Sequence, residues 1–333
     1  MTNREACVNW IKKYFEDNPD GKAIIGISGG KDSTIAAALC VEALGADRVI
    51  GVLMPNISQA DIADSAKVCS ILGIESHLID IGQAYNSISM QIASSFYAND
   101  EQPLGTVWNN KMFITNTPAR LRMTTLYAVA ALYSNSRVVN TCNRSEDYVG
   151  YSTKYGDAAG DFSPLGNLTV REVLEIGDEL GLPEHLVHKA PSDGMCGKTD
   201  EDNLGFTYEQ LDDHILGTAA VDEKIVEKIE GLHKATRHKY KPMPTFHPIW
   251  TEVASEQLSI DDVYPRRGLR AESGIMDDCA DGGLVDPSVT ASALAGNAIM
   301  TGLDIAEPVA ANNVSINTDY KLEDAIRSIE NSI

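Results

Sequence analysis

The sequence lacks several features that would assign the protein to other classes. Its 333 residues include six cysteines but no C-x-x-C pair, which excludes a zinc ribbon and a dithiol redox motif. No apolar run is long enough to cross a bilayer, and the N-terminus lacks the basic start and apolar core of a signal peptide. We therefore expect a cytoplasmic protein without a membrane partner, in which most cysteines are small buried apolar side chains.

Positive charge is scarce as well. Lys and Arg number 27 against 48 Asp and Glu, so the formal net charge is −21. We expect no nucleic-acid partner, because neutralising phosphates requires clustered Lys and Arg. A nucleotide ligand is not excluded, since a local basic pocket can form inside an acidic protein. Hydrophobic residues, at 43%, are numerous enough to build a sizeable core.

Apolar runs alternate with helical patterns over the first half of the chain. The runs predict strands at 23–28, 48–55, 76–81 and 137–142. Helical spacing of apolar residues predicts helices near the N-terminus and at 33–44, 59–72, 83–97, 114–135, 169–180, 207–216 and 219–237. This order predicts an α/β fold, with a doubly wound, mostly parallel sheet and helices on both faces. In such folds, ligands bind at the carboxyl ends of the strands.

The pattern changes twice further along the chain. From residue 143 to about 168 the sequence is polar, rich in Gly and Tyr, and weakly periodic. Residues 246–333 carry 15 acidic against 5 basic residues and mix Gly, Asp and Ala with short apolar runs. We expect one domain at 1–247 and an acidic C-terminal extension at 248–333, which ends in a helix near 321–331.

The motif Ser-Gly-Gly-Lys-Asp-Ser at 28–33 lies between the first predicted strand and the first long helix that follows it. Two adjacent glycines let the backbone turn tightly and approach a phosphate, and the N–H groups of the loop and helix start then face anionic oxygens. Lys31 adds a positive charge. Asp32 beside phosphates is repelled unless a metal lies between them, which indicates Mg²⁺ coordination. The structural alternative is a glycine turn capped by Ser or Asp.

This motif differs from the P-loop, which requires G-x-x-x-x-G-K-[ST]. It resembles the pyrophosphate-binding loop of the ATP pyrophosphatase family. The resemblance implies a Rossmann-like fold and an enzyme that cleaves ATP between its α and β phosphates while adenylating an oxygen of a second substrate.

Four further segments narrow the resemblance to the NAD synthetases of that family. They are N-x-x-A-R-x-R-M at 116–123, S-E at 145–146 with G-Y-S-T-K-Y-G-D at 150–157, P-S at 191–192 with T-D-E at 199–201 and L-G-F-T-Y at 204–208, and H-K at 238–239. The match implies amidation of deamido-NAD: ATP adenylates the nicotinate carboxylate, and ammonia then displaces AMP to give NAD. It also implies a homodimer.

The resemblance assigns roles to individual residues. Asp32 and Lys31 would be catalytic, and Asp32 and Glu146 would bind Mg²⁺. ATP would be bound by Ser28, Gly29, Gly30, Lys31, Asp32, Ser33, Thr34, Thr141 and Ser192. Deamido-NAD would be bound by Arg120, Lys154, Asp161, His238 and Lys239. Each residue also has a structural alternative. Arg120 and Arg122 could be solvated surface charges, and Lys154 and Asp161 could be ordinary polar loop residues. Glu146 could cap a helix, and His238 with Lys239 could be a cation pair at a helix end.

One position departs from the family pattern. The family often has Thr-Lys where this chain has Thr169-Val170, and that lysine contacts an ATP phosphate. Arg171 and Lys189 are the candidates to replace its charge; otherwise the contact is absent. We therefore expect no ATP role for this position.

The sequence also bears on the nitrogen donor and on rival functions. Glutamine-dependent relatives carry a large amidase domain, for which there is no room before residue 28. We therefore expect ammonia as the donor, either free or supplied by a separate protein. One alternative is another ATP pyrophosphatase, such as a tRNA-modifying enzyme; acidity and the lack of cysteine pairs argue against it. Another is a non-catalytic adenine-nucleotide sensor, which would not require both Asp32 and Glu146.

Overall fold

The computed structural model describes residues 1–59, 62–96, 106–189 and 199–246. The expected C-terminal extension at 248–333, with its helix near 321–331, lies outside these residues. Met1–Pro242 belongs to one compact unit, and Met243 begins a second. All helices and strands of the described residues belong to the first unit.

Four parallel strands form the sheet of this unit, in the order β3-β2-β1-β4. They are β1 (Ala23–Gly26), β2 (Val49–Leu53), β3 (Glu75–Leu78) and β4 (Arg137–Val138). The predicted parallel sheet is confirmed, but the strand predicted at 137–142 ends four residues early. Val139 N–H still donates to the Ile24 carbonyl of β1, and just beyond it Cys142 N–H donates to Asn140 Oδ1, a side-chain turn that ends the pairing.

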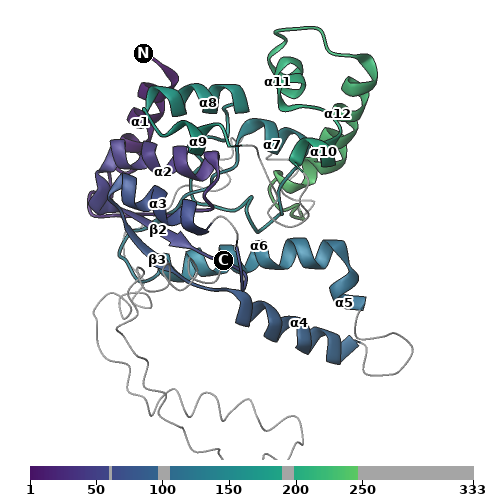
Figure 1. Ribbon diagram of the computed structural model, residues 1–333, viewed down its shortest axis with the longest axis horizontal. Helices are drawn as coiled ribbons and strands as arrows, with labels where there is room; N and C mark the ends of the chain where they lie inside the picture. The colour runs from purple at the N-terminus through teal and green to yellow at the C-terminus, as the bar shows by residue number, and fades with distance from the viewer. Residues whose placement is uncertain (60–61, 97–105, 190–198, 247–333) are drawn as a thin grey trace, which may run out of the picture. The chain divides into compact units, whose positions relative to one another are not determined.

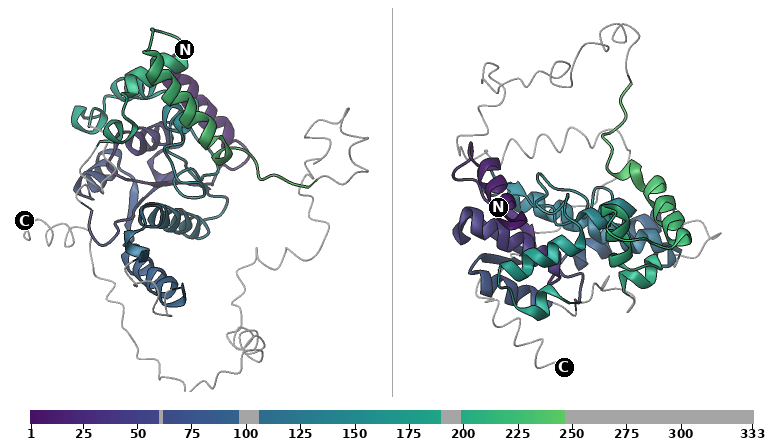
Figure 2. Two further views of the ribbon diagram at one scale, coloured as in Figure 1. Left: turned by 90° about the vertical axis from the view of Figure 1, so that its right-hand side faces the viewer. Right: turned by 90° about the horizontal axis from the view of Figure 1, so that it is seen from above.

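Helices cover both faces of the sheet, as predicted (Figures 1 and 2). One face carries α1 (Asn3–Tyr14), α2 (Lys31–Leu44), α3 (Ile62–Leu72), α8 (Val170–Glu179) and α9 (Glu184–Val187). The other carries α6 (Lys111–Ala130), against which α4 (Gly82–Phe96) and α5 (Thr106–Asn109) pack. Strand alternation divides the core accordingly: Ala23 and Ile25 pack toward the first face and Ile24 toward the second.

The remaining helices form a second apolar cluster beside the sheet. They are α7 (Arg144–Val149), α10 (Asp200–Leu204), α11 (Tyr208–Leu216) and α12 (Glu223–Thr236). Two short 3-10 helices lie outside this cluster: η1 (Ala46–Arg48) precedes β2, and η2 (Arg237–Lys239) follows α12. Leu211 and Ile229 are fully buried where α11 and α12 contribute to this cluster. Among the residues described, no helix is long and apolar enough to span a membrane.

Helix α7 was not predicted, since it falls in the weakly periodic stretch after residue 143. It is too short for apolar periodicity to reveal. A capping box defines its start instead: the Asn143 side chain accepts from Glu146 N–H, and the Glu146 side chain accepts from Asn143 N–H. The four cysteines described are free, and Cys40, Cys69 and Cys142 are buried, as predicted.

Candidate active site

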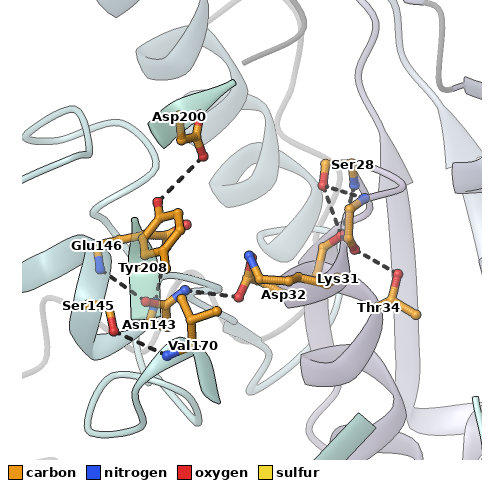
Figure 3. Close-up of polar contacts among 12 residues, drawn as sticks. Ser28, Lys31, Asp32, Thr34, Asn143, Ser145, Glu146, Val170, Asp200 and Tyr208 are labelled. Carbon is orange, nitrogen blue, oxygen red and sulfur yellow. Dashed lines mark hydrogen bonds and ion pairs between the residues drawn. The ribbon is translucent and has the colours of Figure 1, made fainter. Parts of the chain in front are cut away.

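The glycine loop is held by its own hydroxyl groups (Figure 3). Gly29 has φ +80°, in the left-handed region that favours glycine, and α2 begins two residues later. The Ser28 and Ser33 hydroxyls lie 3.0 Å apart, and Ser28 N–H donates to Ser33 Oγ at 3.2 Å. Thr34 Oγ1 donates to the Gly30 carbonyl at 2.8 Å. The hydrogen-bond partners of these hydroxyl groups are other atoms of the loop, and these bonds hold the loop in shape.

Lys31 and Asp32 form an ion pair at the start of α2. Lys31 Nζ lies 2.9 Å from Asp32 Oδ2, and the Lys31 side chain is only 6% exposed. Burial acts to lower the pKa of Lys31, but the charges of Asp32 and Glu146 outweigh it, so the pKa is raised overall. The ammonium group also lies 5.7 Å from the centre of the Tyr208 ring. Lys31 therefore stays positively charged at neutral pH.

Asn143 connects the loop after β1 to the helix after β4. Its Nδ2 donates to Asp32 Oδ1 at 3.0 Å, while its Oδ1 accepts from Glu146 N–H, also at 3.0 Å (Figure 3). Strands β1 and β4 are neighbours in the sheet, so both segments leave the same edge side by side. The capping interpretation of Glu146 is correct, and the same cap brings its helix start beside Asp32.

The Glu146 carboxyl is half-buried and faces other acids. Burial raises its pKa well above the ordinary glutamate value, and the Asp32 charge raises it further, whereas Lys31 opposes the shift. One lysine therefore offsets only part of the repulsion between the two carboxylates. A bound cation between them would remove the rest.

The pairing of Asp32 with Glu146 has the chemistry of a magnesium site. The described residues contain no group of three or more His, Cys, Asp or Glu side chains placed to hold a metal. Mg²⁺ in nucleotide enzymes commonly uses one or two carboxylates and takes its other ligands from phosphates and water. Two hard oxygen donors with unfavourable mutual charge therefore fit a Mg²⁺ ion that arrives with ATP.

Asp200 and Tyr208 belong to the same centre, although sequence reasoning gave them no role. Both side chains are buried, and the Tyr208 hydroxyl lies 3.5 Å from Asp200 Oδ2. The Asp200 charge acts on both Lys31 and Glu146. The signal was available in the sequence, because both residues fall within the T-D-E and L-G-F-T-Y segments that resemble the family.

A second group of predicted residues forms a chain of contacts between distant segments. Arg120 Nε on α6 donates to the Lys154 carbonyl at 3.2 Å, and Lys154 Nζ donates to the His238 carbonyl at 3.2 Å. Lys239 Nζ donates to the carbonyls of Gly150 and Ser152 at 2.6 and 2.7 Å. The structure thus brings three of the five residues predicted to bind deamido-NAD into one group, while Lys239 anchors the adjoining loop.

Asp161 has a structural task at the end of the sheet. Its Oδ2 accepts from Val138 N–H at 2.7 Å and its Oδ1 from the Tyr127 hydroxyl at 3.2 Å. Thr141 lies partly exposed after β4. Ser192 lies outside the described residues. Arg122 is not a solvated surface residue, since it is partly buried and its Nε donates to the Met54 carbonyl at 3.0 Å.

Both cations proposed to replace the missing lysine at Val170 have acidic partners. Val170 is buried in the second apolar cluster. The Arg171 guanidinium pairs with Asp213 at 2.9 Å, and Lys189 Nζ pairs with Asp64 at 2.8 Å. Each of these two cations is thus held by an acid in this structure.

A family model for NAD synthase matches residues 3–243. The chain belongs to the NAD synthase family. It is 36% identical to an NH(3)-dependent NAD(+) synthetase of Thermococcus kodakarensis, over 71% of this chain and 92% of that protein. Among solved structures, an NMN synthetase from Francisella tularensis aligns with TM-score 0.65 and 35% identity, over 74% of this chain and 98% of that one. An NH3-dependent NAD synthetase from Campylobacter jejuni aligns with TM-score 0.57 and 28% identity, over 74% and 98%.

Proposed function

We propose that the protein is an ammonia-dependent NAD synthetase that converts deamido-NAD, ATP and ammonia to NAD, AMP and pyrophosphate. The observation that carries this proposal is the Asp32–Asn143–Glu146 junction in a chain of the NAD synthase family. The junction lies at the carboxyl ends of the neighbouring strands β1 and β4. This is the point where strand order reverses, and ligands of doubly wound sheets bind there. The alternatives of a tRNA-modifying enzyme or a nucleotide sensor have no comparable support.

The reaction has two steps. An oxygen of the nicotinate carboxylate attacks the α-phosphorus of ATP, and the bond to the β-phosphate breaks to release pyrophosphate. Ammonia then attacks the carboxyl carbon, loses a proton, and the carbon–oxygen bond breaks to release AMP. Adenylation is required because a free carboxylate has no adequate leaving group.

This chain contributes position and charge to both steps. The first backbone N–H groups of α2, from Lys31 to Ser33, would face the phosphates, and Lys31 supplies a buried positive charge near them. Asp32 and Glu146 would hold Mg²⁺, whose charge would neutralise the pyrophosphate as it leaves. Thr34, Thr141 and Ser192 complete the proposed ATP site.

The second substrate binds where distant segments meet. Arg120, Lys154 and His238 share a chain of hydrogen bonds, which supports a joint role in binding the pyrophosphate or carboxylate of deamido-NAD. Asp161 and Lys239 are assigned to the same substrate by the family resemblance. Their visible contacts hold the surrounding backbone in place.

We further propose a cytoplasmic homodimer, with residues 1–247 as the catalytic domain and 248–333 as an appended extension. Free cysteines support a reducing compartment. Apolar side chains on α4 and α6 support a protein–protein contact: Ile88, Met90 and Met112 are 41%, 62% and 69% exposed.

A product assay tests the function. With ATP, Mg²⁺, deamido-NAD and ammonium, we expect stoichiometric AMP, pyrophosphate and NAD, with glutamine inactive as a donor. ADP formation, or ATP binding without turnover, would refute the proposal. Because one structural relative is named NMN synthetase, nicotinate mononucleotide is tested as a second acceptor. A higher kcat/KM for the mononucleotide would refute the choice of deamido-NAD while leaving the amidation chemistry intact.

Two variants link the activity to the site. Asp32→Ala is expected to abolish turnover while the folded state is retained. Asp17→Ala, which removes an exposed acid after α1, is its matched control and should keep full activity. Equal activity of the two variants would remove Asp32 from the mechanism.

A further inference from the structure

The start of α8 is held by two side chains that the proposed reaction does not use. The first N–H groups of a helix have no partner within the helix, so other groups must accept from them. Val170 N–H donates to the Ser145 hydroxyl on α7 at 3.1 Å. Arg171 N–H donates to Asp212 Oδ2 on α11 at 2.8 Å. Ser145 and Asp212 thus satisfy the start of α8 from two other helices.

Asp212 also joins α11 to α7. The Ser145 hydroxyl donates to Asp212 Oδ1 at 2.5 Å, so both oxygens of this carboxyl group accept a hydrogen bond. The two side chains are enclosed, since Ser145 is 0% and Asp212 1% exposed. Burial raises the pKa of Asp212 above the ordinary aspartate value, and the hydrogen bonds from Ser145 and Arg171 limit that rise. One buried carboxyl group therefore connects the starts of α7 and α8 to α11.

Helix α7 depends on such contacts for its placement. It has only six residues, fewer than the roughly 12–15 that make an isolated helix even marginally stable. The Asn143 cap fixes where α7 begins, whereas packing against α11 and α12 fixes how it lies. Hydrogen bonds are directional, unlike apolar contacts. The hydrogen bond from Ser145 to Asp212 therefore limits the rotation of α7 about its own axis.

The rotation of α7 matters because Glu146 directly follows Ser145. Successive side chains of an α-helix point about 100° apart, so fixing the direction of one fixes the direction of the next. Figure 3 shows two contacts of this helix start, Ser145 with Val170 and Asn143 with Asp32. A rotation that broke the Ser145 contact would turn the Glu146 carboxyl group relative to Asp32.

We propose that Asp212 is a positioning residue for the metal site. Through the Ser145 hydroxyl, it holds α7 in the rotation that directs the Glu146 carboxylate toward Asp32. Asp212 is not a metal ligand in this scheme, because its oxygens accept from Ser145 and Arg171. The proposal rests on the proposed function, since Glu146 takes part in that reaction by binding Mg²⁺.

Mn²⁺ binding to the full chain tests this role. The protein is titrated with Mn²⁺ in the presence of the α,β-methylene analogue of ATP, and the bound ion is followed by electron paramagnetic resonance. Asp212→Asn should weaken Mn²⁺ binding about fivefold or more, because an amide replaces only one of the two acceptors and a buried hydrogen bond is lost. Equal Mn²⁺ affinity of this variant and the parent would overturn the proposal.

Asp213→Asn is the matched control. It removes the same charge from the next residue of α11, whose partners are the Arg171 guanidinium and the Thr218 hydroxyl. Its Mn²⁺ affinity should stay within about twofold of the parent, because a partly exposed ion pair contributes little. An equal loss in Asp213→Asn and Asp212→Asn would show a general effect of charge and overturn the proposal.

Ser145→Ala tests the link to α7 while Asp212 still accepts from Arg171 N–H. In Ser145→Ala and Asp212→Asn alike, kcat should fall and the Mg²⁺ concentration for half-maximal rate should rise, whereas the KM for deamido-NAD should stay within about twofold. A merely structural defect would lower the active fraction and leave the Mg²⁺ requirement unchanged. That result would overturn the proposal.

The double variant Asp212→Asn/Ser145→Ala distinguishes one shared contact from two independent ones. Its Mn²⁺ affinity should lie within about twofold of the more affected single variant, because both changes break the same hydrogen bond. Effects that multiply would overturn the proposal. A parent that binds Mn²⁺ but makes no NAD would refute the proposed function, whereas the Mn²⁺ affinities of the variants would still decide the role of Asp212.

Discussion

Gly150→Ala should separate the placement of α12 from the rest of the fold. Gly150 ends α7 with φ +67°, and an added Cβ would overlap the Thr236 side chain at the end of α12. The left-handed backbone costs a non-glycine residue about 1–2 kcal/mol. Overpacking adds about 1–3 kcal/mol, so the total loss of unfolding free energy is about 2–5 kcal/mol. Displacing α12 also shifts His238, so the KM for deamido-NAD should rise more than the KM for ATP.

Gly217→Ala is the matched control for this prediction. Gly217 ends α11 with φ +66°, and an added Cβ there meets nothing within 4 Å. It should therefore lose only the backbone contribution of about 1–2 kcal/mol and keep both KM values. Urea unfolding and steady-state kinetics on both variants make the comparison. Equal losses of stability, or an unchanged KM for deamido-NAD in Gly150→Ala, would refute the reasoning.

Three further predictions concern the carboxylate junction. Asn143→Ala and Asn110→Ala each remove an N-cap, and each should lower the free energy of unfolding in urea by about 1 kcal/mol. Only Asn143→Ala should weaken Mg²⁺-dependent turnover, because of the two only Asn143 contacts Asp32. Equal effects of the two variants on turnover would contradict this. The raised pKa of Glu146 predicts that activity falls as pH drops through that pKa, and that more Mg²⁺ moves this loss to lower pH; a limb insensitive to Mg²⁺ would contradict it. The pKa of Glu146 is higher in the folded than in the unfolded protein, so the metal-free protein loses stability as the pH rises from the unfolded to the folded pKa. Glu146→Gln should therefore raise the melting temperature at pH 8 and give no such gain below about pH 4.

The fold was largely predictable because its signals are local. Strands β1 and β2 coincide with short apolar runs, whereas β3 is mostly polar and only overlaps the strand predicted at 76–81. The long helices show apolar spacing over several turns. Helix α7 escaped prediction because capping by Asn143, rather than periodicity, defines it. The end of β4 was also missed, since Asn140 Oδ1 accepts from Cys142 N–H and this local turn replaces further pairing with β1.

The sequence named candidate residues for the site but did not reveal the contacts between them. Asp32 and Glu146 approach each other because β1 pairs with β4, and strand order is a tertiary property. Lys154 reaches His238 across 84 residues because α12 packs against α7. Arg171 and Lys189 were plausible replacements for a missing lysine, yet Asp213 and Asp64 hold them elsewhere. Only the folded chain shows which acid each cation meets.

The fate of the carboxylate oxygen tests the central claim most directly. Deamido-NAD labelled with ¹⁸O in the nicotinate carboxylate is turned over with ATP and ammonium, and the products are analysed by mass spectrometry. Adenylation followed by amidation predicts one labelled oxygen transferred to the phosphate of AMP and one retained in the amide of NAD. Unlabelled AMP, or label in inorganic phosphate, would contradict attack of the carboxylate on the α-phosphorus.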